Sequence, residues 1–319
     1  MIDGKGKRHG LNEARLDAIP SLSQKIYYFQ GCTERAYPGI NAAFIETCRL
    51  LGNAPMTSNE QSCCTGNLLA FNAVPLETPL AISQRNYNVI KAKAPACVTT
   101  CNGCFSSFVT CDYYLKQSRW REYTKSVMKG LGKAFIDDVP VFHAAEFYYK
   151  NRAEIYQHAR RSLDGLKMAI HYGCHFLHQD DPSMILDDFE NPGFLEELVR
   201  GLGGEGVDYR ERLACCGAGL NQRMLHDDRT NSLQITLRKM NSIKSCGAEA
   251  IVVVCPYCLL HLDNAQAELE VEFDEEFELP VLHISELVGI LYDLPASTLR
   301  PDAHKVGLKG IMEKIGYSG

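Results

Sequence analysis

Ten of the 14 cysteines in this 319-residue chain repeat one spacing pattern twice. In each copy, 30 or 40 residues separate a Gly-Cys from a Cys-Cys pair, and 36 or 38 more lead to a Cys-x-x-Cys. The first copy comprises Cys32, Cys63, Cys64, Cys101 and Cys104, and the second comprises Cys174, Cys215, Cys216, Cys255 and Cys258. Thiolates are soft ligands that suit zinc, copper(I) and iron-sulfur clusters. Because two coincidences of this spacing are improbable, the ten cysteines are predicted to serve metal or redox chemistry.

The number of cysteines per copy favours a cluster over a single ion. Four thiolates satisfy zinc or a cubane cluster, whereas each copy offers five. Adjacent side chains such as those of Cys63 and Cys64 diverge from the backbone, so they reach two metal atoms more naturally than one. A zinc ribbon needs its two knuckles about 15 to 20 residues apart, but 150 residues separate Cys104 from Cys255. A multi-iron cluster with non-cubane ligation fits best.

Cys255-Pro256-Tyr257-Cys258 also looks like the redox dithiol of a glutaredoxin. However, Cys101-Asn102-Gly103-Cys104 occupies the equivalent place without the Pro-Tyr centre, and a dithiol has no use for the other cysteines of the pattern. We therefore interpret both sequences as ligand pairs. The four cysteines without a counterpart are predicted to be small buried hydrophobes; they are Cys48, Cys97, Cys111 and Cys246.

Two histidines repeat with the cysteines. Val-x-His-x-x-Glu occurs at 141–146 and 281–286, where a short strand is expected to deliver His143 or His283 just before a helix. The duplication makes a proton-handling or ligand-supporting role as plausible as a purely structural one. His175, beside a cysteine of the pattern, and His171, within a strand, have weaker claims.

The elements that must position these residues alternate between strand and helix. Residues 26–29 and 168–171 are apolar runs that end in Gly-Cys, and 94–99 and 250–254 are apolar runs ahead of Cys-x-x-Cys, so all four are predicted strands. Helical spacing marks 196–199 and 233–243. This alternation predicts an α/β fold with the cysteines at strand ends, where ligands gather in open α/β sheets.

The repeat divides the chain into four predicted segments: an N-terminal arm at 1–24, a first cysteine-rich domain at 25–160, a second at 161–295 and a C-terminal tail at 296–319. We expect two domains related by a pseudo-twofold axis, each a small, mostly parallel sheet flanked by helices. Asp164-Gly165 or the charged residues 150–152 are expected to mark the seam.

Composition restricts the partners and the compartment. Hydrophobic residues make up 45% of the chain and charged residues 23%, as in ordinary globular proteins. With 33 basic and 39 acidic residues, the net charge of −6 gives no footprint for nucleic acid or an anionic membrane. The first 24 residues have no apolar signal segment, and the apolar stretch 250–262 is too short to span a bilayer. We expect a cytoplasmic protein, in which a disulfide framework is improbable.

The motifs resemble those of the B subunit of heterodisulfide reductase over about residues 25–295. They are Gly31-Cys32, Tyr37-Pro38-Gly39, Cys101-Asn102-Gly103-Cys104, His171-Tyr172-Gly173-Cys174-His175-Phe176, Cys215-Cys216-Gly217-Ala218-Gly219 and Val254-Cys255-Pro256-Tyr257-Cys258. The resemblance implies two CCG domains, each holding one non-cubane 4Fe-4S cluster with its five cysteines. It also implies a disulfide substrate between the clusters. The implied partners are the other components of such a complex, namely a cubane iron-sulfur electron-transfer subunit (C-like) and a flavin subunit (A-like).

One loop departs from this family. Methanogen members usually follow the first Cys-Cys pair with Pro-Ala-Pro-Gly, whereas this chain has Thr65-Gly66-Asn67-Leu68. The ligands survive, but the loop would line the active site. The substrate is therefore open between the heterodisulfide of coenzymes M and B and the lipoate-bound sulfur handled by similar proteins of sulfur-metabolising bacteria.

The resemblance predicts a catalytic subunit that reduces a disulfide with two electrons, or oxidises thiols in reverse. Protons would come from His143, His283 or water. Two alternatives stay open. One is a CCG-type electron-transfer subunit of a quinone-linked dehydrogenase, for which a membrane-binding amphipathic helix is expected. The other is an electron relay or zinc scaffold without catalysis.

Overall fold

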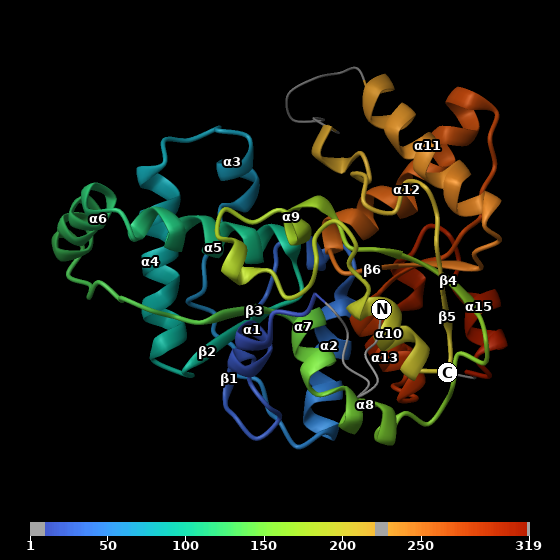
Figure 1. Ribbon diagram of the computed structural model, residues 1–319, viewed down its shortest axis with the longest axis horizontal. Coiled ribbons are helices and arrows are strands. Elements are labelled where there is room, and N and C mark those ends of the chain that lie inside the picture. The colour runs from blue at the N-terminus through green and yellow to red at the C-terminus, as the bar shows by residue number, and fades with distance from the viewer. Residues whose placement is uncertain (1–9, 221–228, 318–319) are drawn as a thin grey trace. The chain divides into compact units, whose positions relative to one another are not determined.

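Two parallel sheets organise the computed structural model, which describes residues 10–220 and 229–317 (Figure 1). The first sheet has the order β1-β2-β3, with β1 at Ile26–Phe29, β2 at Ala96–Thr99 and β3 at Val141–His143. Met56 adds a single parallel bridge to Tyr27 of β1. All three strands are buried along their whole length, as expected for a parallel sheet covered on both faces.

The second sheet has the order β5-β4-β6-β7. Its strands are β4 (Lys167–His171), β5 (Glu205–Val207), β6 (Ala250–Val253) and β7 (Val281–His283). β4, β6 and β7 repeat the order of β1, β2 and β3, and β5 lies on the edge where the first sheet has only the Met56 bridge. Every strand pair in the described residues is parallel, so the predicted α/β fold with two parallel sheets is confirmed.

Helices connect and cover the strands. Those of the first half are α1 (Glu13–Ala18), α2 (Pro38–Leu50), α3 (Gly66–Ala70), α4 (Glu77–Lys91), α5 (Asn102–Leu115), α6 (Ser118–Gly130), α7 (Ala144–Lys150) and α8 (Arg152–His158). Those of the second half are α9 (Cys174–Leu177), α10 (Phe194–Gly201), α11 (Thr230–Ser245), α12 (Pro256–Phe273), α13 (Ile284–Leu291), α14 (Ala296–Leu299) and α15 (Lys309–Lys314). Cys101 and Cys255 are the N-cap residues of α5 and α12, directly after β2 and β6, which confirms the predicted strand-to-helix setting of both Cys-x-x-Cys motifs.

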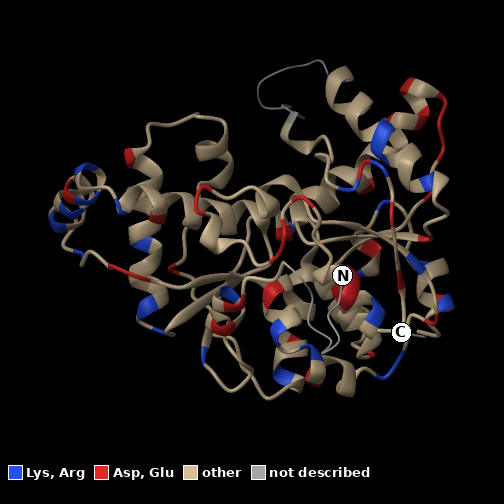
Figure 2. Cartoon of the chain, in the orientation of Figure 1, with Lys and Arg blue, Asp and Glu red and all other residues tan. Residues whose placement is uncertain are grey.

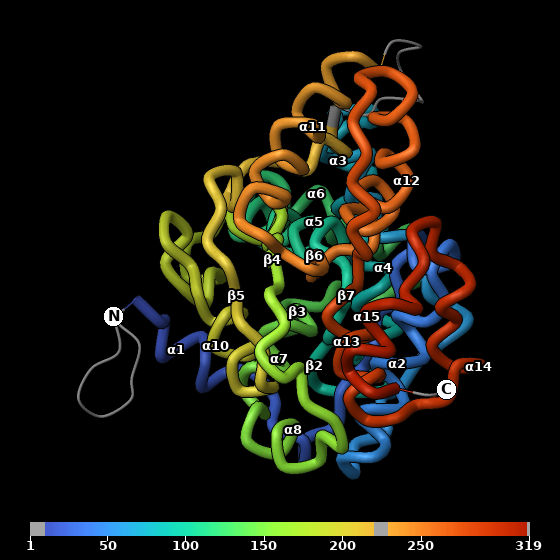
Figure 3. The backbone as a smooth tube through the Cα atoms, turned by 90° about the vertical axis from the view of Figure 1, so that its right-hand side faces the viewer, coloured from blue at the N-terminus to red at the C-terminus, as the bar shows by residue number. Residues whose placement is uncertain are grey.

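The chain forms two compact units that are interleaved along the sequence. One contains the described residues of Met1–Gly31, Gly52–Asn151 and His175–Phe194, and the other contains Cys32–Leu51, Arg152–Cys174 and the described residues of Leu195–Gly319. In the second unit α2 packs against α13 and α14, and α2 lies beside α13 in Figure 3. The chain changes unit at both Gly-Cys motifs. The domain limits read from the repeat, 25–160 and 161–295, stay a prediction about the repeat.

The helices differ in charge and polarity. Figure 2 shows lysines and arginines spaced along α6, whose basic residues include Arg121 and Lys125 above the ring of Phe135. α11 and α12 pack side by side in the second unit (Figures 1 and 3). Among the described residues, no helix is both long and apolar enough to cross a membrane.

Candidate metal centres

The buried sulfurs of the first cysteine set meet between two loops of the first unit. Cys104 hydrogen-bonds with Cys101 and Cys64, and these bonds together with burial raise the pKa of Cys104 well above its usual value. All three side chains are buried, whereas Cys63 is exposed. Cys32, the fifth predicted ligand, is exposed and begins a segment of the other unit.

The second cysteine set forms one connected group within the second unit. The sulfurs of Cys216 and Cys258 lie 3.5 Å apart. Hydrogen bonds link Cys258 to Cys255, and Cys215 to both Cys174 and Cys216. Those from Cys174 and Cys216 hold the pKa of Cys215 well below its usual value. The group therefore favours a thiolate surrounded by further sulfur donors.

Backbone N–H groups point at sulfur in both Cys-Cys loops. Thr65 N donates to Cys63 Sγ and Gly66 N to Cys64 Sγ, each at 3.3 Å. In the second loop Gly217 N donates to Cys215 Sγ, also at 3.3 Å. Successive N–H groups of this kind stabilise anions, and anionic sulfur is the form that binds metals.

Gly66 lets the two loops of the first unit approach each other. A Cβ atom at this position would lie 2.5 Å from the carbonyl oxygen of Gly103, which sits between Cys101 and Cys104. Real Cβ atoms do not approach backbone oxygen so closely. A residue with a side chain at 66 would therefore separate Cys64 from the Cys-x-x-Cys turn.

Hydroxyl groups anchor the second cysteine of each pair. Ser107 Oγ on α5 donates to the carbonyl oxygen of Cys64 at 2.6 Å, and Thr236 Oγ1 on α11 donates to that of Cys216 at 3.0 Å. Neither residue was predicted from the sequence. The only signal was positional, since Ser107 follows its Cys-x-x-Cys by three residues just as His261, which hydrogen-bonds with Thr236, follows the other.

His143 and His283 cap the helices that follow β3 and β7. His143 Nδ1 accepts from Ala145 N and His283 Nδ1 from Ser285 N, both at 3.1 Å. The glutamate three residues on closes each capping box by accepting from the histidine N–H. Both histidines are fully buried, and with Nδ1 as acceptor a neutral ring carries its proton on Nε2. Their predicted proton-handling role stays a prediction.

Each capping glutamate also binds a cation from one end of the chain. Arg15 of α1 forms two hydrogen bonds with Glu146, at 2.9 and 2.8 Å. His304 Nε2, beyond α14, lies 3.2 Å from Glu286 Oε1. Burial by itself lowers the pKa of His304, but hydrogen bonding and the charge of Glu286 outweigh it, and the net pKa is raised. The predicted arm and tail are therefore each anchored within their own unit at these residues.

His171 lies beside the second cysteine group. One of its ring nitrogens and the sulfurs of Cys216 and Cys258 are all within 4.8 Å of one another. The side chain is 1% exposed, and this burial lowers the pKa of His171 to about 3, so that it is neutral. From the sequence His171 had only a weak claim, because a histidine inside a strand is usually a core residue.

The four cysteines outside the pattern lie apart from these contacts. Cys48, Cys97 and Cys111 are fully buried, and burial raises the pKa of each thiol, that of Cys111 to about 12. Cys246 is half-buried, and its sulfur is 3.0 Å from the carbonyl oxygen of Ile243. No disulfide joins any of the cysteines in the part of the chain that the structure describes.

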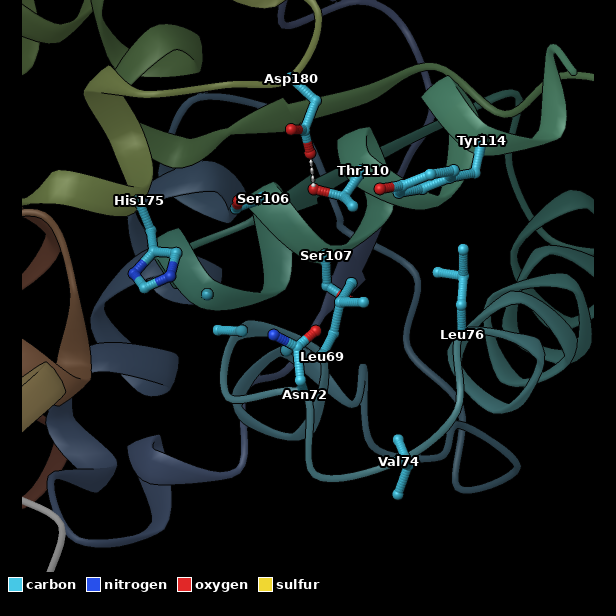
Figure 4. Close-up of a pocket in the computed structure, with 13 residues that line it drawn as sticks. Leu69, Asn72, Val74, Leu76, Ser106, Ser107, Thr110, Tyr114, His175 and Asp180 are labelled. Carbon is cyan, nitrogen blue, oxygen red and sulfur yellow. Dashed lines mark hydrogen bonds between the residues drawn. The ribbon is translucent and has the colours of Figure 1, made fainter.

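A cavity of about 350 Å³ adjoins the first cysteine loops (Figure 4). Gly66 and Gly103 form part of its wall, and one face of α5 contributes Ser106, Thr110 and Tyr114. The remaining lining residues are Leu69, Ala70, Asn72, Val74, Leu76, Ser107, His175 and Asp180. Asp180 accepts a hydrogen bond from Thr110 at 2.6 Å. The wall is thus half aliphatic and half hydroxyl and amide, with one carboxylate.

The donor sets fit a soft metal centre. Buried sulfurs converge in both units, N–H groups point at them, and one sulfur of the second set is held as a thiolate. Such donors suit iron-sulfur clusters or zinc. The hard cations magnesium and calcium, which prefer oxygen ligands, do not suit them.

Comparison with known proteins gives the family. The model of the CCG cysteine-rich domain matches residues 26–132 and 168–263. The B subunit of the ferredoxin:CoB-CoM heterodisulfide reductase of Methanosarcina mazei is 32% identical over 278 residues, covering 83% of this chain and 88% of that protein. The chain belongs to the CCG family that includes the B subunit of heterodisulfide reductase. A B-like homologue of that enzyme from Archaeoglobus profundus is 30% identical over 72% of this chain.

Two more distant relatives widen this family picture. The 8-methylmenaquinol:fumarate reductase membrane anchor subunit of Wolinella succinogenes is 24% identical, covering 87% of this chain and 95% of that subunit. The crystal structure of a hypothetical protein from Helicobacter pylori matches with a TM-score of 0.68 at 8% identity. The match covers 93% of this CCG protein and 56% of the Helicobacter chain, and it shows the fold alone.

Proposed function

We propose that this protein is the catalytic subunit of a heterodisulfide reductase or a related complex. The carrying observation is the duplicated cysteine set, with buried, mutually bonded sulfurs in each unit. The relatives named as B subunits of heterodisulfide reductase, or as similar to them, support the assignment. In the proposed reaction R–S–S–R′ takes up two electrons and two protons, the S–S bond breaks, and RSH and R′SH leave; thiol oxidation is the reverse.

Each cysteine set would hold one non-cubane 4Fe-4S cluster. Cys32, Cys63, Cys64, Cys101 and Cys104 would bind the first, and Cys174, Cys215, Cys216, Cys255 and Cys258 the second. When bound, iron-sulfur clusters supply electrons one at a time, so two of them match the two electrons of a disulfide. His143 and His283, with Nε2–H, or water would supply the protons. The electrons would come from a flavin subunit through a cubane-cluster subunit.

The cavity beside Gly66 and Gly103 would accept one arm of the substrate. Among the described lining residues there is no lysine or arginine, and Asp180 adds a negative charge. An anionic arm, such as a sulfonate, would be repelled by Asp180 and would find no cation there. Aliphatic walls with hydroxyl and amide groups suit a neutral, amide-bearing arm instead.

Metal analysis tests the catalytic assignment. Anaerobically purified protein should contain about eight irons and as many sulfides, as expected for two four-iron clusters. Under oxidising conditions, a candidate thiol should produce a paramagnetic signal that is broadened by iron-57. Zinc in place of iron, or clearly fewer than eight irons, would contradict the proposal.

Three disulfides with equal two-carbon arms test the substrate arm. We expect neutral N,N′-diacetylcystamine to be reduced with a higher kcat/KM than dianionic dithiobis(ethanesulfonate), and cationic cystamine supplies the third charge. Asp180→Lys should shift the preference towards the sulfonate by roughly tenfold, equivalent to about 1.4 kcal/mol. Asp188→Lys, the same charge change outside the cavity lining, should leave it unchanged.

A second candidate function rests on the Wolinella relative. Its printed name places it in a fumarate reductase that uses 8-methylmenaquinol, so we also consider an electron-transfer subunit of a quinone-linked enzyme. Reduced protein should then be oxidised by a menaquinone analogue, with no thiol-dependent signal. Reoxidation by a disulfide alone favours the first proposal.

A further inference from the structure

His171 is a buried polar side chain whose hydrogen-bonding groups are not used by the described residues. It ends β4, paired with Val253 of β6, and is 1% exposed. Neither ring nitrogen has a hydrogen-bond partner in the described part of the chain. Since a buried nitrogen without a partner costs free energy, native proteins usually give it one, from protein, water or a bound group.

The nearest polar atoms to consider are sulfurs of the second cysteine set. One ring nitrogen of His171, Cys216 Sγ and Cys258 Sγ lie within 4.8 Å of one another, and the two sulfurs are 3.5 Å apart. These separations suit three donors around one metal-sulfur centre, since metal-sulfur and metal-nitrogen bonds are about 2.3 and 2.1 Å long. The imidazole edge thus faces the same point as two predicted ligands.

The first unit has no such group at the same place. The Gly-Cys motifs align Phe29 with His171, and Phe29 packs edge-on against Phe108 with their ring centroids 4.9 Å apart. Phe29 is also paired with the residue at the end of the neighbouring strand, Thr99. The same backbone position therefore carries a purely apolar ring in one unit and an imidazole in the other.

We infer that His171 contacts the second metal centre through a ring nitrogen and raises the reduction potential of that centre above that of the first. This inference rests on the metal centres of the proposed function but not on the identity of the substrate. Imidazole ligation and hydrogen bonds to sulfur both raise the potential of iron-sulfur sites. The two centres of this chain are therefore unequal, and the second accepts an electron first.

Isotope labelling tests the contact directly. Protein with ¹⁵N-histidine should show a nitrogen hyperfine coupling to the paramagnetic second centre. His171→Phe, the residue of the first unit, should abolish that coupling, whereas His261→Gln, which removes another buried histidine of the same unit, should preserve it. A strong coupling would identify a bond to metal and a weak one a hydrogen bond to sulfur, and both support the contact. A coupling that is absent, or that survives in His171→Phe, overturns it.

A redox titration tests the consequence. In His171→Phe one of the two midpoint potentials should fall while the other stays constant, and His171→Gln, which keeps an N–H donor, should fall less. Iron content and circular dichroism show whether each variant is folded and loaded, and Phe29→Tyr serves as a second folded reference. Unchanged potentials in a fully loaded His171→Phe protein would overturn the inference. If the wild-type protein lacks iron altogether, it is the proposed function that fails.

Discussion

The two cysteine regions share their ligands but not their surroundings. Both have a Cys-Cys loop with N–H groups on sulfur, a Cys-x-x-Cys turn at a strand end and a hydroxyl on a cysteine carbonyl. Behind the first set lie aromatic rings, with Tyr87 and Phe108 stacked at 5.4 Å. Behind the second lie His171 and Lys239, both buried. Duplication has preserved the donor atoms while the electrostatic environment diverged.

Charge makes the contrast sharper. Asp112 lies on the same helix as Cys104 and accepts a hydrogen bond from Tyr87 at 2.7 Å; burial raises its pKa to about 7. In the second unit, Lys239 lies on α11, with its ammonium group 5.4 Å from the ring centroid of Tyr209. Burial lowers the pKa of Lys239 to about 8, which leaves it mostly charged at neutral pH. An acid behind one set and a base behind the other favour unequal potentials in the same direction as His171.

The largest expected effect comes from removing one buried ligand in each region. Cys64→Ser and Cys216→Ser should each lose one centre, which is about half of the iron. Iron and sulfide analysis of anaerobic protein measures this loss. Cys246→Ser, outside both sets, should keep the full complement. If either ligand variant keeps all its iron, the set to which that cysteine belongs is wrongly assigned.

The capping glutamates should differ in their contribution to stability. Glu146→Gln leaves the buried guanidinium of Arg15 without its counter-charge, and breaking such a pair costs about 3–5 kcal/mol. Glu286→Gln should cost less, about 1–2 kcal/mol, because His304 can lose its proton. Urea unfolding measures both. Glu46→Gln, in an exposed pair with Arg49, is the control and should change stability by less than about 1 kcal/mol. Equal costs at 146 and 286 would contradict this account.

The same pair of contacts predicts a pH dependence in one region only. The pKa of His304 is raised in the folded protein, so its contribution is fully present below the unfolded value of about 6.5 and is lost as the pH rises through the folded value. Arg15 stays charged and contributes no such slope. Unfolding free energies measured from pH 5.5 to 8.5 should fall for the wild type, and this slope should be reduced in His304→Gln. A variant with the wild-type slope would assign the dependence to another group.

Local features of both regions could be predicted from the sequence. Short apolar runs gave the correct strands before Cys32 and Cys174, because strand periodicity and the Gly-Cys ends are properties of neighbouring residues. The chain exchange between units could not be predicted, since it depends on how α2 packs against α13. Nor could the contact of Arg15 with Glu146, 131 residues away. The place of His171 was missed because only the folded sheet brings its ring to Cys216 and Cys258.

The smallest expected effect concerns the backbone of the two Cys-Cys loops. Thr65 has a φ of 63° and Gly217, which follows the other Cys-Cys pair, has a φ of 101°. A β-branched residue is strained in this left-handed region, whereas glycine is not. Thr65 also donates a hydrogen bond from its hydroxyl to the carbonyl oxygen of Cys64 at 2.5 Å.

Two substitutions separate the strain at Thr65 from this hydrogen bond. Thr65→Ala and Thr65→Gly both lose the hydroxyl, but only the alanine keeps a Cβ atom. Thr65→Gly should therefore be more stable than Thr65→Ala by about 1 kcal/mol, as measured by urea unfolding of the loaded protein. A more stable alanine variant would mean that the loop relaxes out of the left-handed region. The first Cys-Cys loop would then differ from the second in backbone conformation as well as in its surroundings.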